Sequence, residues 1–222
     1  MDDALRTRLT EILGRYGIDG TAMVLTPADA AGLGRAVRVC ADAGMSVRPR
    51  SGSAAGGTRD GVVTVSLERM DEIDVRAPSL TARAGAGASV ATLRTAVEVA
   101  GLAFAAEIGS GSRGGAHVGS LIARGGVSRR ALTGIEAVLT TGEQISSGGR
   151  MLKDVGPYDL AAALLGSQGR LAIIVAATFR LVPAGAEVPP HPPHGPLVPN
   201  QLDELVRVAF DPGGVLAPVL PS

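Results

Sequence analysis

Apolar residues recur at helical spacing near the N-terminus and again after Thr26. The first pattern runs over 5–16 and stops at Gly17, which predicts a short helix. In the second, Thr26 is a favourable N-cap, Pro27 suits the first helical position, and Gly44 ends the helix. Further helices are predicted at 89–101, 158–166 and 200–210, the last with Asn200 as its N-cap.

Runs of β-branched and other apolar residues between these helices predict strands. Short strands are expected at 23–26, 47–50, 62–67 and 80–85, and a hairpin over 134–149 should turn at Gly142–Glu143. The longest run, 171–183, predicts a buried strand rich in isoleucine and valine. Helices and hairpins are interleaved without regular β-α-β winding, so the predicted fold class is α+β.

The segment after this strand changes character. Residues 183–199 hold half of the chain's 14 prolines and can form neither a helix nor the centre of a sheet. We interpret the segment as a linker or extended tail. His191 and His194 lie in it, but a metal site there would lack rigid support, so a solvated tail is favoured. No metal site is predicted.

Composition narrows the classes of function. The formal net charge is zero and aromatic residues make up 2% of the chain, which argues against a nucleic-acid partner. Cys40 is the single cysteine and lies on an apolar helix face, so we expect a core residue and no disulfide. The longest apolar run is shorter than the ~20 residues that span a bilayer. With an acidic rather than basic N-terminus, these features predict a cytoplasmic protein without a membrane span.

Common catalytic motifs are absent from the sequence, which has no G-x-S-x-G, no H-E-x-x-H and no Walker A pattern. Two glycine-rich loops remain. "PRSGSAAGG", Pro49–Gly57, follows a strand, and its small residues leave backbone N–H groups able to bind an anion such as a pyrophosphate; a flexible turn is an equal alternative. "GSGSRG", Gly109–Gly114, matches G-x-G-x-x-G but lacks the long helix and the acidic residue of a Rossmann site.

Taken together, several segments resemble the FAD-binding domain of the vanillyl-alcohol-oxidase and cresol-methylhydroxylase (PCMH) type, and most of all its small glycolate oxidase subunits. They are "LTPADAAGLGRAVRVCADAG", "VRPRSGSAAGG", "HVGSLIA", "GGRMLKDVGPYDLAAALLGSQGRLAIIVAATFRLVP" and the terminal "FDPGGVLAP". The resemblance implies an N-terminal helix (1–20), an FAD-binding domain (21–183) with subdomains of about 21–77 and 78–183, a proline-rich linker (184–199), and a C-terminal helix and tail (200–222).

The resemblance also implies FAD as cofactor, held between the two subdomains. The cofactor-binding residues carried over from it are Arg50, Ser51, Gly52, Ser53, Ala54, Ala55 and Gly56 in the first loop; Gly115, His117, Val118, Gly119, Ser120 and Ala123 in the second; and Gly169, Ile173 and Ile174 in a third region. No catalytic residue is predicted.

The chain departs from the family at the same places. The usual R-G-G-G-T reads Arg50–Ala54, the usual T-I-G-G reads His117–Ser120, and the usual G-T-L-G reads Gly169–Ala172. Each change adds side-chain bulk where a backbone should approach a ligand. The family's cap domain, which covers the substrate face of the flavin, is absent between the FAD domain and the terminal motif.

These features predict a reduced FAD-binding-type subunit of a flavin-dependent 2-hydroxy-acid dehydrogenase, of the glycolate or lactate type. Without a cap it should act with a larger, complete FAD-containing catalytic subunit, and an iron–sulfur subunit is a further candidate partner. The alternative is a flavin-free structural or regulatory subunit that keeps the fold and has lost the cofactor.

Overall fold

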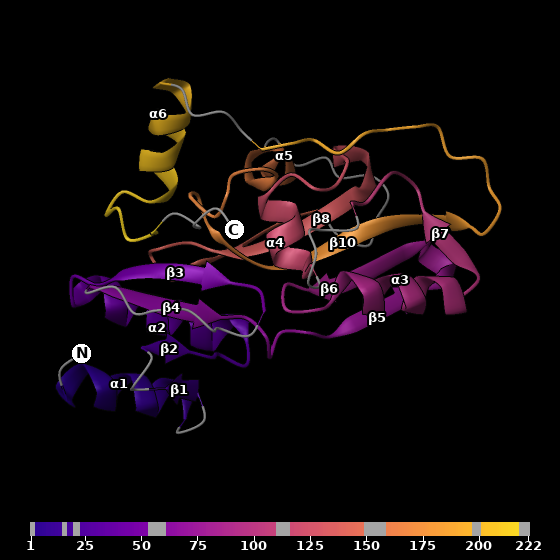
Figure 1. Ribbon diagram of the computed structural model, residues 1–222. Helices are drawn as coiled ribbons and strands as arrows, with labels where there is room; N and C mark the ends of the chain where they lie inside the picture. The colour runs from indigo at the N-terminus through magenta and orange to yellow at the C-terminus, as the bar shows by residue number, and fades with distance from the viewer. Residues whose placement is uncertain are drawn as a thin grey trace.

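The structure is a computed structural model that describes residues 3–14, 17–19, 23–52, 61–109, 116–148, 159–196 and 201–217. Two sheets lie end to end, each covered by helices, which confirms the α+β fold class (Figure 1). Within this part of the chain, no helix combines the length and apolar character that crossing a membrane requires.

The first sheet lies in the N-terminal third of the chain and has the strand order β1-β2-β4-β3. Its strands are β1 (Ile18–Asp19), β2 (Val24–Leu25), β3 (Ser46–Arg50) and β4 (Val62–Ser66), of which β2, β4 and β3 run parallel. Two helices, α1 (Asp3–Leu13) and α2 (Ala30–Asp42), pack with it around a core that includes Leu9, Leu33 and Val65. Both helices were predicted from apolar spacing.

The predicted start of α2 was wrong by three residues. The N-cap is Asp29, whose carboxylate accepts a hydrogen bond from the Gly32 amide at 2.7 Å. Thr26 instead donates its amide to the Gly17 carbonyl at 2.7 Å, which ties it to the strands. Asp29, two residues after Pro27, therefore caps the helix in place of Thr26. The backbone of Thr26 is instead hydrogen-bonded next to β1 and β2.

The second sheet is antiparallel and has the order β5-β6-β10-β8-β9. Its strands are β5 (Ile73–Arg76), β6 (Thr81–Gly85), β8 (Leu132–Val138), β9 (Gln144–Gly148) and β10 (Ile173–Pro183), and β7 (Leu102–Phe104) pairs with the end of β10. Three helices, α3 (Val90–Val99), α4 (Val118–Ala123) and α5 (Leu160–Leu164), share one core with these strands. The predicted hairpin is present, and Gly142 has the positive φ (81°) that its turn requires.

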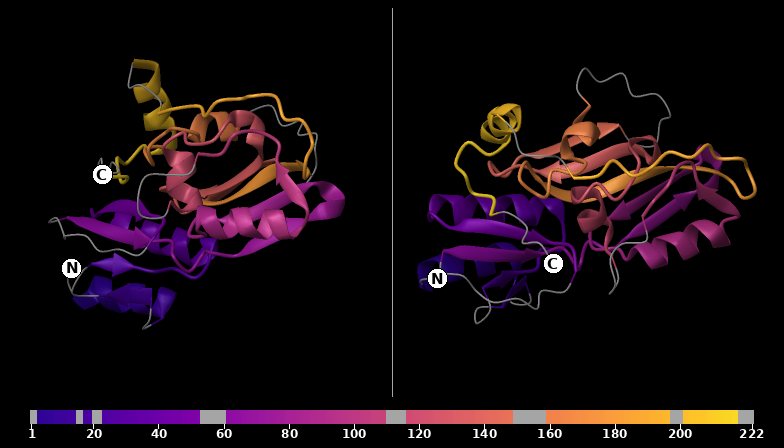
Figure 2. Two further views of the ribbon diagram at one scale, coloured as in Figure 1. Left: turned by 45° about the vertical axis from the view of Figure 1, so that its right-hand side comes forward. Right: turned by 45° about the horizontal axis from the view of Figure 1, so that its top comes forward.

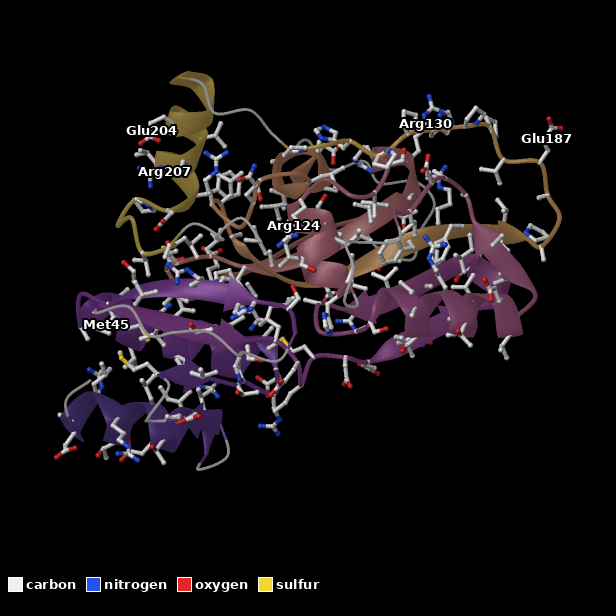
Figure 3. The ribbon with its side chains drawn as sticks, in the orientation of Figure 1. Met45, Arg124, Arg130, Glu187, Glu204 and Arg207 are labelled. Atoms are coloured by element: carbon white, nitrogen blue, oxygen red, sulfur yellow. The ribbon has the colours of Figure 1, made fainter. Side chains whose placement is uncertain are left out.

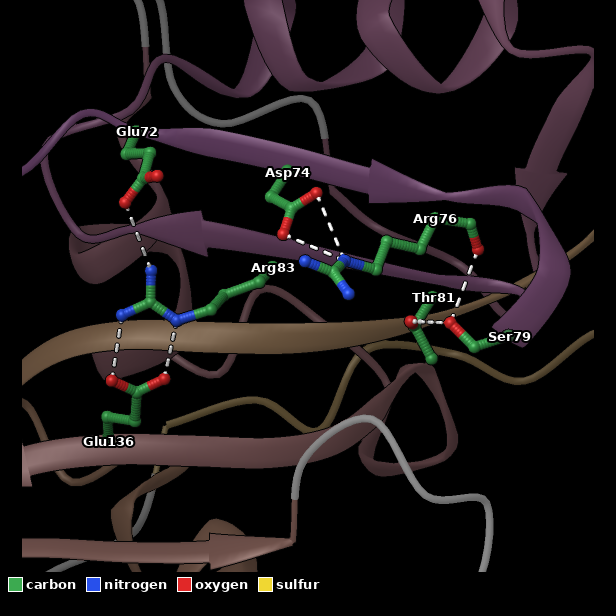
Figure 4. Close-up of polar contacts among 7 residues, drawn as sticks. All are labelled: Glu72, Asp74, Arg76, Ser79, Thr81, Arg83 and Glu136. Carbon is green, nitrogen blue, oxygen red and sulfur yellow. Dashed lines mark hydrogen bonds and ion pairs between the residues drawn. The ribbon is translucent and has the colours of Figure 1, made fainter.

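The opposite face of the second sheet carries polar residues, except at the end where Val138, Ile173 and Val175 pack in the core of the first sheet. Arg83 on β6 makes a bidentate ion pair with Glu136 on β8, with distances of 2.6 and 2.8 Å, and lies 3.6 Å from Glu72 (Figure 4). The hydrogen bonds to Glu136 raise the pKa of Arg83 above its ordinary value. The pair reaches across β10, so it links β6 and β8 through side chains as well as through the shared strand.

β10 belongs to both cores. Ile173 and Val175 pack in the core of the first sheet, whereas Ile174 packs in the core of the second. This follows from the period of two in a strand, which sends neighbouring side chains to opposite faces. The change from one sheet to the other along the chain falls between Ser66 and Ile73, somewhat before the boundary near residue 77 that the sequence suggested.

The proline-rich segment forms a strap, residues 184–196, that runs from the end of β10 back along the second subdomain toward α6 (Gln201–Phe210) (Figure 2). It contains neither helix nor strand, as predicted, but it is tied to the body by backbone hydrogen bonds, including His194 N to Val127 O at 3.0 Å. The proposed N-cap of α6, Asn200, lies outside the described residues.

After α6 the chain returns to the first sheet. Leu216 forms a parallel bridge with Val47 of β3, and the Val47 amide donates to the Val215 carbonyl at 2.7 Å. Asp211, which is 1% exposed, accepts hydrogen bonds from the amides of Val215 (2.8 Å) and Leu216 (2.9 Å). Its carboxylate therefore shapes the turn that places this segment, and the segment covers an edge of the sheet.

We predict that Asp211→Ala lowers the free energy of unfolding by about 2–3 kcal/mol, because two charge-assisted hydrogen bonds are lost and two amides are left in a buried turn. Thermal unfolding followed by circular dichroism should show a fall of roughly 5–10 °C in Tm. Asp71→Ala, at an exposed position, is the control and should leave Tm unchanged. Equal effects of the two substitutions would contradict this role.

We also predict that Cys40 is inert in the folded protein. Its side chain is 0% exposed, and burial raises its pKa to about 11. At pH 8 only about one molecule in a thousand would then carry the thiolate. A thiol-reactive disulfide reagent should label the native protein at least about 100-fold more slowly than the urea-unfolded protein. Comparable rates in the two states would show that Cys40 is accessible.

Candidate functional site

The first predicted loop begins where β3 ends. Arg50 closes β3 and is exposed, Ser51 is buried, and the carbonyl of Gly52 accepts a hydrogen bond from Ser66 Oγ at 3.3 Å. Ser66 is the last residue of β4, so the start of the loop is held by the neighbouring strand. The remaining predicted residues, Ser53, Ala54, Ala55 and Gly56, lie outside the described residues.

The second predicted loop leads into α4. The amides of Val118 and Gly119 donate to the carbonyls of Ala88 and Ala86, each at 2.9 Å, and Ser120 Oγ donates to the His117 carbonyl at 2.9 Å. Two of the first amides of the helix are therefore already bonded within the protein, and the start of α4 is fixed on the turn that follows β6. Gly115 lies outside the described residues.

The two loops meet at their glycines. A Cβ atom on Gly52 would lie 2.6 Å from Cε1 and 2.9 Å from Nδ1 of His117, so the imidazole rests on the backbone of the first loop. A Cβ atom on Gly119 would lie 2.9 Å from Ser51 Oγ and 2.8 Å from the Cβ of Ala86. We call these five residues the loop junction. Its packing requires glycine at both positions as the loops stand.

The loop junction offers polar atoms to a ligand. Among the described residues, neither the Ser51 hydroxyl nor either ring nitrogen of His117 has a hydrogen-bond partner. A hydroxyl and an imidazole N–H can both donate to an anionic oxygen. Because its available polar atoms are donors, the junction suits a phosphate-bearing group better than an apolar one.

The third predicted region lies at the other end of α4. The amides of Gly166 and Gln168 donate to the carbonyls of Ile122 (3.0 Å) and Ala123 (2.7 Å). Gly169 has a positive φ of 71°, and so does Gln168, at 57°, which marks a tightly wound loop. Ser167 in this loop is 2% exposed, and within the described residues its hydroxyl has no hydrogen-bond partner.

Two residues of this region present no side chain to a ligand. Ile173 is 0% and Ile174 is 5% exposed, and each side chain belongs to one of the two cores. The structure thus brings Ser51–Gly52 together with His117–Gly119, and it places Ala123 and Gly169 at the opposite end of α4. Whether all of them contact a cofactor stays a prediction.

Ala86 is not among the residues predicted for the site. It lies in the turn after β6, accepts the Gly119 amide, and donates its own amide to the Val175 carbonyl of β10 at 2.9 Å. A Cβ on either neighbouring glycine would collide with backbone: Gly85 with Met70 O at 2.0 Å and Gly87 with Leu67 O at 2.1 Å. The alternation Gly-Ala-Gly directly after a predicted strand was the signal for this close approach.

Two curated proteins are similar to this chain in sequence. The chain is 30% identical over 174 residues to "Glycolate oxidase subunit GlcD" of Bacillus subtilis, which covers 72% of this chain and 37% of that protein. It is 36% identical over 135 residues to "D-lactate dehydrogenase" of Archaeoglobus fulgidus, covering 57% of this chain and 30% of the relative. The chain thus spans about a third of the length of these relatives.

Solved structures share the fold. A 4-ethylphenol oxidase from Gulosibacter chungangensis superposes with a TM-score of 0.63 at 19% identity, covering 83% of this chain and 43% of the other. The wild-type form of Phl p 4.0202, a glucose dehydrogenase, superposes with a TM-score of 0.58 at 19% identity, covering 82% of this chain and 40% of the other. At these identities the likeness concerns the fold alone.

The family follows from the sequence match. Residues 21–148, more than half of the 222-residue chain, match the family described as "FAD binding domain". The match includes both loops of the junction, and the two-sheet fold agrees with it. The chain therefore belongs to the FAD-binding-domain family, and FAD is the cofactor that membership of this family implies.

Proposed function

We propose that this protein is a reduced FAD-binding subunit of a flavin-dependent 2-hydroxy-acid dehydrogenase and acts with a complete catalytic flavoprotein subunit. The observation that carries the proposal is the path of the chain after β10. Among the described residues, 184–196 form the strap and 201–214 form α6 and the turn at Asp211, and the chain then pairs with β3. This described part of the chain contains no domain that could cover a bound substrate.

The substrate class comes from the relatives. The two relatives described above are named for glycolate and D-lactate, which are both small 2-hydroxy acids. We propose the same class of substrate for the complex in which this chain takes part. One of these relatives is named as a subunit of glycolate oxidase. This name supports our proposal that the present chain also takes part in a multi-subunit assembly.

The loop junction fits a bound FAD. Ser51 Oγ and the His117 imidazole would donate hydrogen bonds to the diphosphate. Ala86 and Gly119 hold the two loops together. When bound, FAD supplies the acceptor for a hydride from the 2-hydroxy acid. The protein itself contributes binding and orientation.

A flavin-free subunit is the alternative, and one observation favours it. The amides of Val118 and Gly119 are bonded to Ala88 and Ala86, and the imidazole of His117 lies over Gly52. The protein therefore already uses two backbone amides that a cofactor could bind, and the imidazole fills part of the space that a cofactor could occupy. Side-chain donors at Ser51 and His117 offset this loss, which is why we favour FAD binding.

Purification with natural partners tests the proposal. We expect a complex with the absorbance of oxidised flavin, in which FAD remains with this chain after the partner is removed, and no oxidation of glycolate or lactate by the isolated chain. The measurements are the visible spectrum of each separated subunit and dye-linked turnover. A colourless, folded chain would favour the flavin-free alternative, and turnover by the isolated chain would overturn the need for a partner.

A matched pair of substitutions tests the junction. Gly119→Ala places its Cβ against Ala86 and Ser51, so we expect lower stability, by about 2 kcal/mol, and loss of FAD affinity. Gly52→Ala meets only the His117 ring, which can turn away, so Tm should change little while FAD affinity falls. FAD fluorescence titration and thermal unfolding separate the two. Unchanged FAD affinity in both variants would place the cofactor elsewhere.

A further inference from the structure

The strap spans a hollow between two anchors. Its first end is held by Ala184 N to Gly101 O at 3.0 Å, and its second by Gly195 N to Gly125 O at 2.9 Å. Between the anchors, four prolines at 189, 190, 192 and 193 lack the N–H group that would bond to the body. Glu187 in this stretch is exposed and projects outward (Figure 3). The strap therefore bridges the surface of the second subdomain.

A pocket of about 400 Å³ lies beneath the bridge. Its walls come from α3, from β7 with the residues that follow it (106–108), and from residues 188–191 of the strap. The apolar lining includes Val97, Leu102, Phe104 and Ile108, together with the two strap prolines. This size and lining are typical of sites for small molecules.

The pocket is held in shape by one short segment of backbone. Residues 125–128 anchor the end of the strap, through Gly125 and Val127, and also bind the pocket wall through Ser128 N to Glu107 O (3.1 Å) and Gly109 N to Gly126 O (2.8 Å). Both sides of the pocket are thus fixed to the same support. Small ligands bind best to sites that are formed in advance.

Arg94 supplies the charge within the pocket. Its guanidinium lies over the Phe104 ring, 6.0 Å from the ring centre, and donates one hydrogen bond to the Ile108 carbonyl. Among the described residues it has no carboxylate partner, which leaves further N–H donors available. Glu98 and Glu107 also line the pocket, and both are exposed.

We propose that this pocket binds a small organic monocarboxylate with an apolar or aromatic body. The carboxylate would pair with Arg94, and the body would lie between Phe104 and the strap prolines. An arginine fork matches the two oxygens of a carboxylate. The two lining glutamates, Glu98 and Glu107, disfavour ligands with two or more negative charges, such as phosphate esters. This site is separate from the loop junction and does not depend on the proposed function.

Benzoate is a suitable probe, because it combines a carboxylate with a flat apolar ring. Calorimetric or NMR titration of the full chain to about 50 mM covers the weakest affinity expected for a ligand of this size. We expect saturable binding of benzoate, with weaker binding of benzyl alcohol, which lacks the charge, and of phenyl phosphate, which carries two. Arg94→Gln should weaken benzoate binding at least about 10-fold.

Two further variants complete the test. Arg35→Gln removes an exposed arginine from α2 and should bind benzoate like the wild type. Ala103→Phe keeps Arg94 but fills the pocket, so it should abolish binding even if Arg94→Gln fails to fold. The proposal is overturned if the wild type shows no saturable binding, if benzyl alcohol binds as well as benzoate, or if Ala103→Phe leaves the affinity unchanged.

Discussion

The alternation of side chains along β10 is the constraint on which the rest of the structure depends. One strand contributes Ile173 and Val175 to the core beside the first sheet and Ile174 to the core of the second. Neither subdomain can rotate against the other without exposing one of these buried side chains. The fixed arrangement of the sheets in turn fixes the distance between the loops that each sheet presents, so the loop junction is a product of core packing as much as of local sequence.

At the junction the same rigidity is maintained by small side chains. Ala86 connects three elements, because its carbonyl binds the start of α4 and its amide binds β10. Glycine at 52 and 119 then lets the two loops approach until side-chain and backbone atoms touch. This differs from the glycine-rich pattern expected of the family, in which several glycines stand in a row. In this chain Ser51, His117 and Ala86 make the contacts at the junction. Glycine is present at positions 52 and 119, where a Cβ atom would lie too close to these residues.

Much of the fold could be predicted from local patterns. Apolar spacing identified α1 and α2, β-branched runs identified β10, and the glycine at 142 identified the hairpin. The cap of α2 could not be read locally, because the backbone of Thr26 is used by Gly17, a residue outside the pattern. The family resemblance indicated the two loops that meet at the junction. It could not predict that His117 would lie on Gly52 or that Ala86 would join them, since both depend on packing between distant segments. The hydrogen bonds that anchor the strap could not be predicted either, because a proline-rich sequence is equally compatible with a free tail and with a segment bonded at both ends.

The pairing of Leu216 with β3 has a consequence for how the protein is made. Residues 215–217 leave the ribosome long after β3, so the first sheet presents an open edge while most of the chain is being synthesised. An exposed strand edge can pair with other chains, and contacts between distant parts of a sequence form slowly. That edge pairs poorly with strands of other chains before residues 215–217 are synthesised, because β3 contains Arg48, Pro49 and Arg50. The first subdomain is therefore synthesised before the second but is completed after it.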